Sequence, residues 1–181
     1  EEAYKIYKIK NEKKREKKAN EFIDLHRTMW TKIKFLGCFD TVAALGTPWK
    51  GVNAILSTIP LFLHKFHNLK LSDSVEHARH ALSLDENRKP FLPTLWDPLP
   101  NNLQNQERIK QIWFSGVHTD IGGGYAEHGL SDITLNWMIK EAKDKGLLIY
   151  SKNNVEKNIR ENVEDTMHDE YKGKFKLTGK A

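Results

Sequence analysis

Apolar residues along the chain alternate between helical spacing and short continuous runs. In the second half of residues 4–30 they recur at helical spacing, which predicts a surface helix whose second half is docked on the protein. Residues 32–39 are almost continuously apolar, as is typical of a central strand in a parallel sheet. A second apolar and aromatic run opens at Ile109 and predicts another buried strand.

Two further segments have the spacing of helices. Residues 74–84 predict a short helix, and residues 130–145 predict a longer one that is capped by Ser131 and ended by Gly146. The alternation of strands and helices favours an α/β fold with a mainly parallel sheet flanked by helices. With 181 residues, the chain is long enough for one domain or a large part of one.

Residues 44–106 are expected to form an insertion or irregular region around the shorter helix. Within them, the apolar run 55–66 predicts core packing, or a cover over a cleft that contacts an acyl chain. Residues 90–106 contain four prolines and predict an irregular surface connection. Farther on, residues 147–150 predict an extended segment and residues 151–164 a loop or short helix.

A dense polar group follows the start of the shorter helix. The spacing of its histidines and carboxylates fits no standard set of metal ligands, so no metal site is predicted. Internal ion pairs are expected instead among these residues: His77, Arg79, His80, Asp85, Glu86 and Arg88.

The second apolar run breaks into a glycine-rich turn that contains His118 and Asp120. Side chains at the carboxyl end of a strand in an α/β sheet point into the crevice where ligands bind. A titratable pair before a flexible turn suits a catalytic loop, although a tight turn with a buried histidine has the same pattern. The glycines of the turn allow backbone angles that other residues rarely adopt: Gly122, Gly123 and Gly124.

Two more polar residues are candidates for a site. Asp40 ends the first apolar run, where a carboxylate either caps the next turn or orients another side chain. His168 lies in a polar loop near the end of the chain, where an exposed histidine and a catalytic one are both compatible with the pattern.

Charge and cysteine content exclude several classes of protein. The net charge is +5, but the basic runs fit a solvated helix face and come with no nucleic-acid motif, so no nucleic-acid partner is expected. Cys38 is the only cysteine, which excludes an internal disulfide framework and a cysteine-based zinc site. The chain has neither a signal peptide nor an apolar stretch of about 20 residues, which predicts a cytoplasmic protein or one secreted without a cleavable signal.

No serine of the chain has glycines two positions before and two positions after it. That Gly-x-Ser-x-Gly elbow carries the nucleophile of α/β-hydrolases, whose triad follows the order Ser, acid, His. Either the protein is not such an enzyme, or the elbow precedes Glu1. The chain lacks a starting methionine and begins as if cut inside a longer protein, which is compatible with the second option.

Three ordered motifs resemble the uncharacterised α/β-hydrolase domain family that includes the phospholipase effectors of type VI secretion. They are Phe-Leu-Gly-Cys-Phe-Asp-Thr-Val-Ala-Ala-Leu-Gly at 35–46, Ala-Arg-His-Ala-Leu-Ser-Leu-Asp-Glu-Asn-Arg at 78–88, and Ile-Trp-Phe-Ser-Gly-Val-His-Thr-Asp-Ile-Gly-Gly-Gly-Tyr at 112–125. The similarity continues through residues 130–142 and to His168-Asp169, and covers about residues 30–180. At Asp169-Glu170 the chain departs from the Asp-Ser that relatives more often show.

The resemblance implies a Ser-Asp-His hydrolase that acts on an ester or lipid, phospholipids included, and needs no cofactor. Its serine is expected before Glu1, so residues 1–181 would be the inactive carboxyl-terminal part of a single catalytic domain, with 1–30 as a leading helix. The implied acid is Asp120 and the implied base is His168, with His118 and Asp40 in support. The assignment of Asp40 as acid and His118 as base also satisfies the order and stays open.

The rival hypothesis is a non-catalytic module of a secreted effector, in which the glycine turn is structural and the basic ends contact a membrane or partner. Peripheral membrane contact and an immunity or delivery protein are compatible with both hypotheses.

Overall fold

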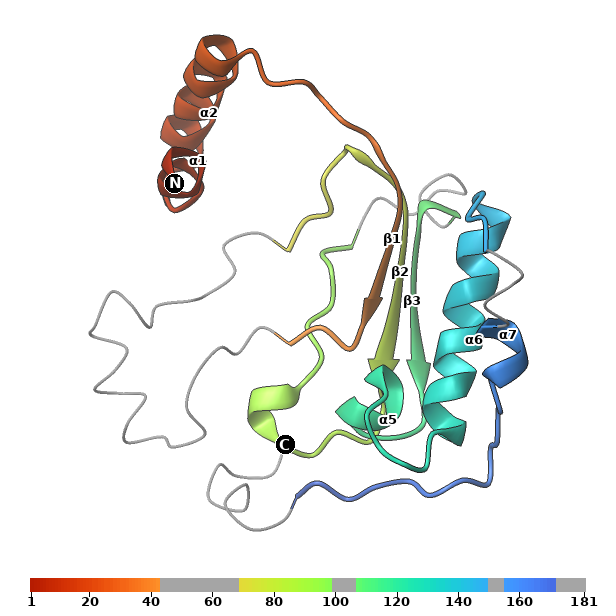
Figure 1. Ribbon diagram of the computed structural model, residues 1–181. Coiled ribbons are helices and arrows are strands. Elements are labelled where there is room, and N and C mark those ends of the chain that lie inside the picture. The colour runs from red at the N-terminus through yellow and green to blue at the C-terminus, as the bar shows by residue number, and fades with distance from the viewer. Residues whose placement is uncertain (43–68, 99–106, 150–154, 172–181) are drawn as a thin grey trace.

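A three-stranded parallel sheet forms the centre of the protein (Figure 1). The computed structural model describes residues 1–42, 69–98, 107–149 and 155–171. The strands lie in the order β1 (Ile33–Phe39), β2 (Val75–Ser83) and β3 (Ile109–Phe114). Phe39 pairs with Ala81 and Ser83 with Phe114, so all three strands end at the same edge of the sheet.

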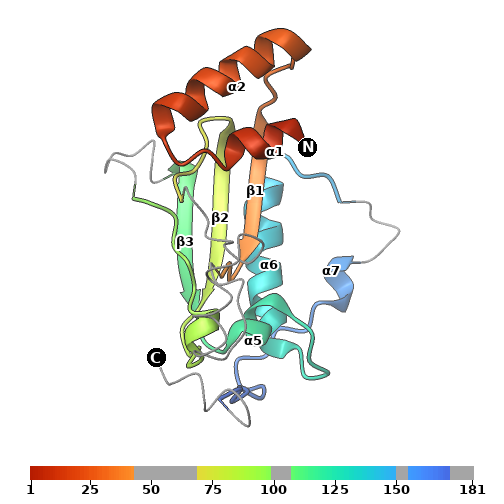
Figure 2. The same ribbon diagram turned by 90° about the vertical axis from the view of Figure 1, so that its left-hand side faces the viewer.

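Helix α6 (Gly129–Asp144) packs along one face of this sheet (Figures 1 and 2). Arg79 of β2 forms an ion pair with Glu141 of α6, and the rings of Phe114 and Trp137 lie 5.4 Å apart. Because side chains alternate along a strand, His80 points to the opposite face, where its ring lies 4.9 Å from that of Trp96. The expected α/β layering of helix on parallel sheet is therefore confirmed.

The segment predicted as a helix at 74–84 is strand β2, and that prediction was wrong. Residues Ala78 to Ser83 are all buried, because β2 has a strand on each side and structure on both faces. A strand buried on both faces need not alternate apolar and polar residues, so its pattern can imitate that of a helix. The prediction that residues 32–39 form a central strand was half right: β1 is parallel, but it lies at the edge of the described sheet.

The leading helix is divided into α1 (Glu2–Tyr7) and α2 (Glu12–His26). Asn11 caps α2 by accepting a hydrogen bond from the backbone N–H of Lys14, so the helix restarts there. The predicted docking of the second half was wrong: α2 has no buried residue and stands apart from the sheet in Figure 1. Within the helix the ring of Phe22 lies 4.2 Å from that of His26, while Ile23 and Leu25 are exposed.

The predicted long helix is confirmed as α6, which ends before Gly146 at a positive φ of 98°. Its N-cap is His128 and not Ser131, whose hydroxyl lies inside the first turn and donates to the carbonyl oxygen of His128. Residues 147–149 form no strand, whereas α7 (Val155–Asn158) agrees with the short helix expected after them.

The remaining described elements are short. The 3-10 helix η2 (Lys89–Phe91) opens the irregular connection, which is described as far as residue 98, and α5 (His118–Gly122) lies at the carboxyl ends of the strands (Figure 1). The apolar run 55–66 lies outside the described residues. Among the described helices, none combines the length and apolar character needed to cross a bilayer.

Candidate active site

Asp40 is completely buried at the carboxyl end of β1 and adopts a left-handed backbone conformation, with φ at 44°. Its carboxylate accepts hydrogen bonds from the backbone N–H of Ser83 at 2.7 Å and from the hydroxyl of Ser83 at 2.8 Å. The second oxygen also lies 2.7 Å from Nδ1 of His118. Three donors hold one buried carboxylate here, so Asp40 orients a histidine and does not merely cap a turn.

His118 follows β3 as the first residue of α5. Since the Asp40 carboxylate is an acceptor, Nδ1 of His118 carries the hydrogen and Nε2 has a lone pair available. Nε2 has no hydrogen-bond partner within the described part of the chain, and the side chain is 32 % exposed. The histidine is thus held at one nitrogen and accessible at the other, as a general base requires.

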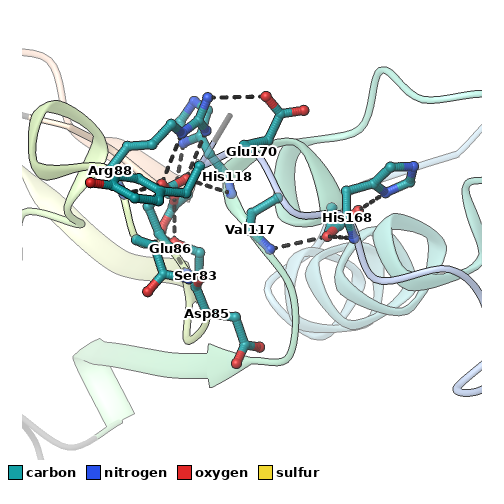
Figure 3. A network of polar contacts seen from close by, with 12 residues as sticks. Ser83, Asp85, Glu86, Arg88, Val117, His118, His168 and Glu170 are labelled. Carbon is teal, nitrogen blue, oxygen red and sulfur yellow. Dashed lines mark hydrogen bonds and ion pairs between the residues drawn. The ribbon is translucent and has the colours of Figure 1, made fainter. Parts of the chain in front are cut away.

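Three consecutive backbone amides in the turn before α5 each donate to a different carboxylate. The N–H of Gly116 donates to Asp85 at 2.7 Å, that of Val117 to Asp120 at 3.1 Å, and that of His118 to Glu86 at 3.3 Å. In Figure 3, Val117 lies between the His118 cluster and the His168 cluster. The backbone that presents His118 is therefore fixed from three directions.

A second histidine–carboxylate pair lies on the other side of this turn. Nδ1 of His168 is 2.7 Å from Asp120, whose other oxygen accepts the backbone N–H of His168 at 3.1 Å. Nε2 of His168 lies 3.8 Å from a carboxylate oxygen of Glu127, and its ring stacks on Tyr125 at 3.6 Å between centroids. Both nitrogens of this histidine thus face carboxylates.

Tyr125 extends this second cluster toward Glu170. Its hydroxyl donates to the carboxylate of Glu170. Burial, together with that carboxylate, raises the pKa of Tyr125 to about 12, so the phenol stays protonated at neutral pH.

A buried ion pair between Glu86 and Arg88 adjoins His118 (Figure 3). Glu86 accepts the backbone N–H of Arg88 at 2.7 Å and its guanidinium at 2.9 and 2.7 Å. Burial alone would raise the pKa of Glu86, but the hydrogen bonds and charge of Arg88 lower it overall. The predicted internal ion pairs are confirmed for Glu86 and Arg88, whereas Arg79 pairs with Glu141, which lies outside the predicted group.

The glycine turn needs its glycines at particular positions. Gly116, Gly123 and Gly124 have φ values of 118°, 82° and 133°, which side chains rarely tolerate. Gly122 has no such angle and is the last residue of α5.

A cavity formed by described residues adjoins this site. This cavity of about 520 Å³ opens beside Ser83, the partner of Asp40, and its lining is mainly apolar: Ser83, Leu84, Glu86, Leu92, Pro93 and Trp113. A larger cavity of about 690 Å³ lies between β1 and the end of α6, away from Asp40 and His118. Its position does not fit the chemistry of the two histidine pairs.

Residues 1–141 match the family model described as "T6SS, Phospholipase effector Tle1-like, catalytic domain". The chain belongs to this family. No curated protein and no solved structure matches the chain. The Tle1-like match confirms the resemblance seen in the motifs, and the name of the family gives its substrate class as phospholipid. Asp40, His118 and Asp120 lie within the matched range, whereas His168 lies beyond it.

All four site residues predicted for this Tle1-like chain lie at the carboxyl edge of the sheet, as two hydrogen-bonded pairs. In the described residues, no group of three or more histidine, cysteine or acidic side chains is arranged to hold a metal. Ser83 was missed as a partner of Asp40 because its segment was predicted to be helical. Had that segment been identified as a strand, its last residue would have been placed beside the end of β1.

Proposed function

We propose that this Tle1-like chain supplies the acid and the base of a serine phospholipase with an α/β-hydrolase fold. The observation that carries the proposal is the Asp40–His118 pair, held at the carboxyl edge of a parallel sheet, with no described residue bonded to Nε2 of His118. The nucleophile is a serine in a Gly-x-Ser-x-Gly elbow that residues 1–181 do not contain.

The chemistry follows from the tautomer that Asp40 fixes. Nε2 of His118 takes the serine proton while the serine oxygen attacks the ester carbonyl, and the buried Asp40 carboxylate stabilises the resulting imidazolium. His118 returns the proton to the leaving alcohol oxygen, which leaves an acyl-enzyme. Water, deprotonated by the same nitrogen, then releases the fatty acid and restores the serine.

Two observations favour His118 over His168 as the base. Nε2 of His118 has no partner in the described residues, whereas that of His168 lies 3.8 Å from Glu127. The Tle1-like match also ends before His168. The assignment of Asp120 and His168 remains the competing hypothesis.

The oxyanion hole comes from other backbone N–H groups than those of the His118 turn. Gly116, Val117 and His118 already donate their amides to carboxylates. A tetrahedral oxyanion needs donors that are free to point at it. The cavity beside Ser83 supports a lipid substrate, since its apolar lining suits an acyl chain next to Asp40.

The test is phospholipid hydrolysis by the longer protein that carries the elbow, with folding checked for each variant. We expect His118→Ala and Asp40→Asn to lose about 10⁴-fold in kcat. His168→Ala and Asp120→Asn should lose only about 10- to 100-fold, through misplacement of the His118 turn. The reverse ranking would make Asp120 and His168 the catalytic pair. If the wild type hydrolyses no ester but binds anionic vesicles in a salt-sensitive way, the binding-module hypothesis is the better one.

A further inference from the structure

The carboxylate of Glu86 connects the end of β2 to the turn that presents His118. One oxygen of Glu86 accepts two hydrogen bonds from Arg88, at 2.7 Å from the backbone and 2.9 Å from the guanidinium. The other oxygen accepts Arg88 at 2.7 Å and the backbone N–H of His118 at 3.3 Å. The backbone of His118 is therefore tied to a carboxylate that is itself clamped by a guanidinium.

Arg88 also supports the other side of the histidine. Its guanidinium carbon lies 4.0 Å from the centroid of the Phe91 ring, and that ring lies 5.6 Å from the imidazole of His118. A second ion pair joins Arg88 to Glu170 at 3.4 Å. The Glu86–Arg88 ion pair thus supports His118 in two ways, through the backbone amide of His118 and through the ring of Phe91.

The burial of this ion pair makes a purely stabilising role a weak explanation. Glu86 is 6 % exposed and Arg88 is 5 % exposed, so both charges lose most of their hydration on folding. Such pairs contribute little net stability compared with apolar residues of similar volume, whereas they fix directions that apolar contacts leave free. Here the fixed direction is that of the N–H of His118.

We propose that Glu86 is a positioning residue for His118, which keeps the imidazole aligned with Asp40 and directed at the nucleophile. The inference rests on the proposed role of His118 as the base. Glu86 acts through the backbone, so its loss disturbs the proton transfer. Glu86 also lines the cavity proposed for the acyl chain, and a glutamine there keeps the size of the side chain.

The test compares Glu86→Gln with Glu141→Gln in the longer protein. Both variants break a Glu–Arg ion pair, but the pair of Glu141 with Arg79 lies on the α6 face and does not touch His118. We expect Glu86→Gln to lower kcat about 10- to 100-fold with KM changed less than about twofold, because a displacement of about 1 Å has that effect. Glu141→Gln should keep kcat within about twofold at temperatures where both variants are folded.

A proton NMR readout separates this inference from the proposed function. The hydrogen between Nδ1 of His118 and Asp40 is assigned by its loss in His118→Gln. It should broaden or shift in Glu86→Gln and stay unchanged in Glu141→Gln, whether or not the protein turns over lipid. An unchanged signal in Glu86→Gln, or equal losses of kcat in the two variants, overturns the positioning role. If Glu86→Gln does not fold, Arg88→Lys takes its place, since it keeps the charge and loses the bidentate contact.

Discussion

Nδ1 of His118 lies 2.7 Å from Oδ2 of Asp40, across 78 positions of the sequence. The two residues meet because β1 and β3 both run parallel to β2 and end at the same edge. Ser83 at the end of β2 lies between them and donates two hydrogen bonds to Asp40. The middle strand thus supplies the contacts that hold this carboxylate and aim it at the histidine.

Asp40→Asn is expected to keep the fold and to lose about 10⁴-fold in kcat. An amide can present its NH₂ to Nδ1 of His118, which moves the ring hydrogen to Nε2 and removes the basic lone pair. Steady-state hydrolysis of phospholipid, with the melting temperature of each variant, measures both effects.

Asp132→Asn is the matched control for that substitution. Asp132 is also buried and also lies 2.8 Å from a histidine nitrogen, that of His128, but it contacts neither His118 nor His168. It should retain kcat within about tenfold, since it perturbs the start of α6 and the contact of Asp132 with the backbone N–H of Arg160, away from His118. Comparable losses in the two aspartate variants would contradict a catalytic role for Asp40.

Gly116→Ala is expected to destabilise the protein by about 2–4 kcal/mol. Gly116 has φ at 118°, and an added Cβ would lie 2.5 Å from Cβ of Asp120. Gly122→Ala is the control, because nothing lies within 4 Å of its added Cβ and alanine favours a helix by up to about 1 kcal/mol. Chemical denaturation of both variants gives the two free energies of unfolding. Equal values would show that the turn does not depend on the backbone angle of Gly116.

His168→Ala is expected to speed amide hydrogen exchange in residues 166–171, while residues 159–165 keep their protection from exchange. The first group is tied to α5 through the His168–Asp120 bonds. The second group keeps its own ties, in which Asp132 accepts the N–H of Arg160 and Asp165 accepts the N–H of Gly129. Hydrogen exchange by mass spectrometry resolves the two segments. Faster exchange throughout residues 159–171, or in neither segment, would contradict a local tie.

Much of the site could be predicted from the sequence because the chain marks the ends of its strands with polar residues. Asp40 and His118 each follow an apolar run, and parallel strands bring such positions together. The pairing of His168 with Asp120 depends on a long path around α6, and only the resemblance to the family pointed to it. The sequence could not show that Nε2 of His168 faces a carboxylate, since that depends on where Glu127 lies in space.

The wrong prediction of a helix at 74–84 has a physical cause as well. Strand β2 has the sequence pattern of a helix because it is buried on both faces, and Arg79 and His80 interrupt its apolar residues. Each has a distant partner in the fold: Glu141 pairs with Arg79, and the N–H of Thr41 donates to His80. Partners more than 30 positions away leave no local signal in the sequence.

The stability of the fold is expected to fall with pH below about 6.5, and His80 is a cause of that fall. His80 is completely buried, and its Nε2 accepts the backbone N–H of Thr41 at 3.0 Å, which requires the neutral imidazole. Burial lowers the pKa of His80 below the ordinary value of 6.5, although its contact with Gln111 and the charge of Asp40 oppose this.

The direction of this pH dependence follows from the different pKa of His80 in the folded and unfolded states. As pH falls through about 6.5, the unfolded chain binds a proton at His80 and the folded chain does not, so the free energy of unfolding decreases by up to about 1.4 kcal/mol per pH unit until the folded pKa is reached.

His80→Gln removes the titrating group, and its amide oxygen can still accept from Thr41. Denaturation from pH 8 to pH 5 should therefore give a shallower decline for His80→Gln than for the wild type, with parallel curves above pH 7.5. Identical slopes between pH 7 and pH 5 would mean that His80 takes up its proton equally in both states. Since Thr41 follows Asp40 directly, the same titration would loosen the backbone beside the proposed catalytic carboxylate in acid.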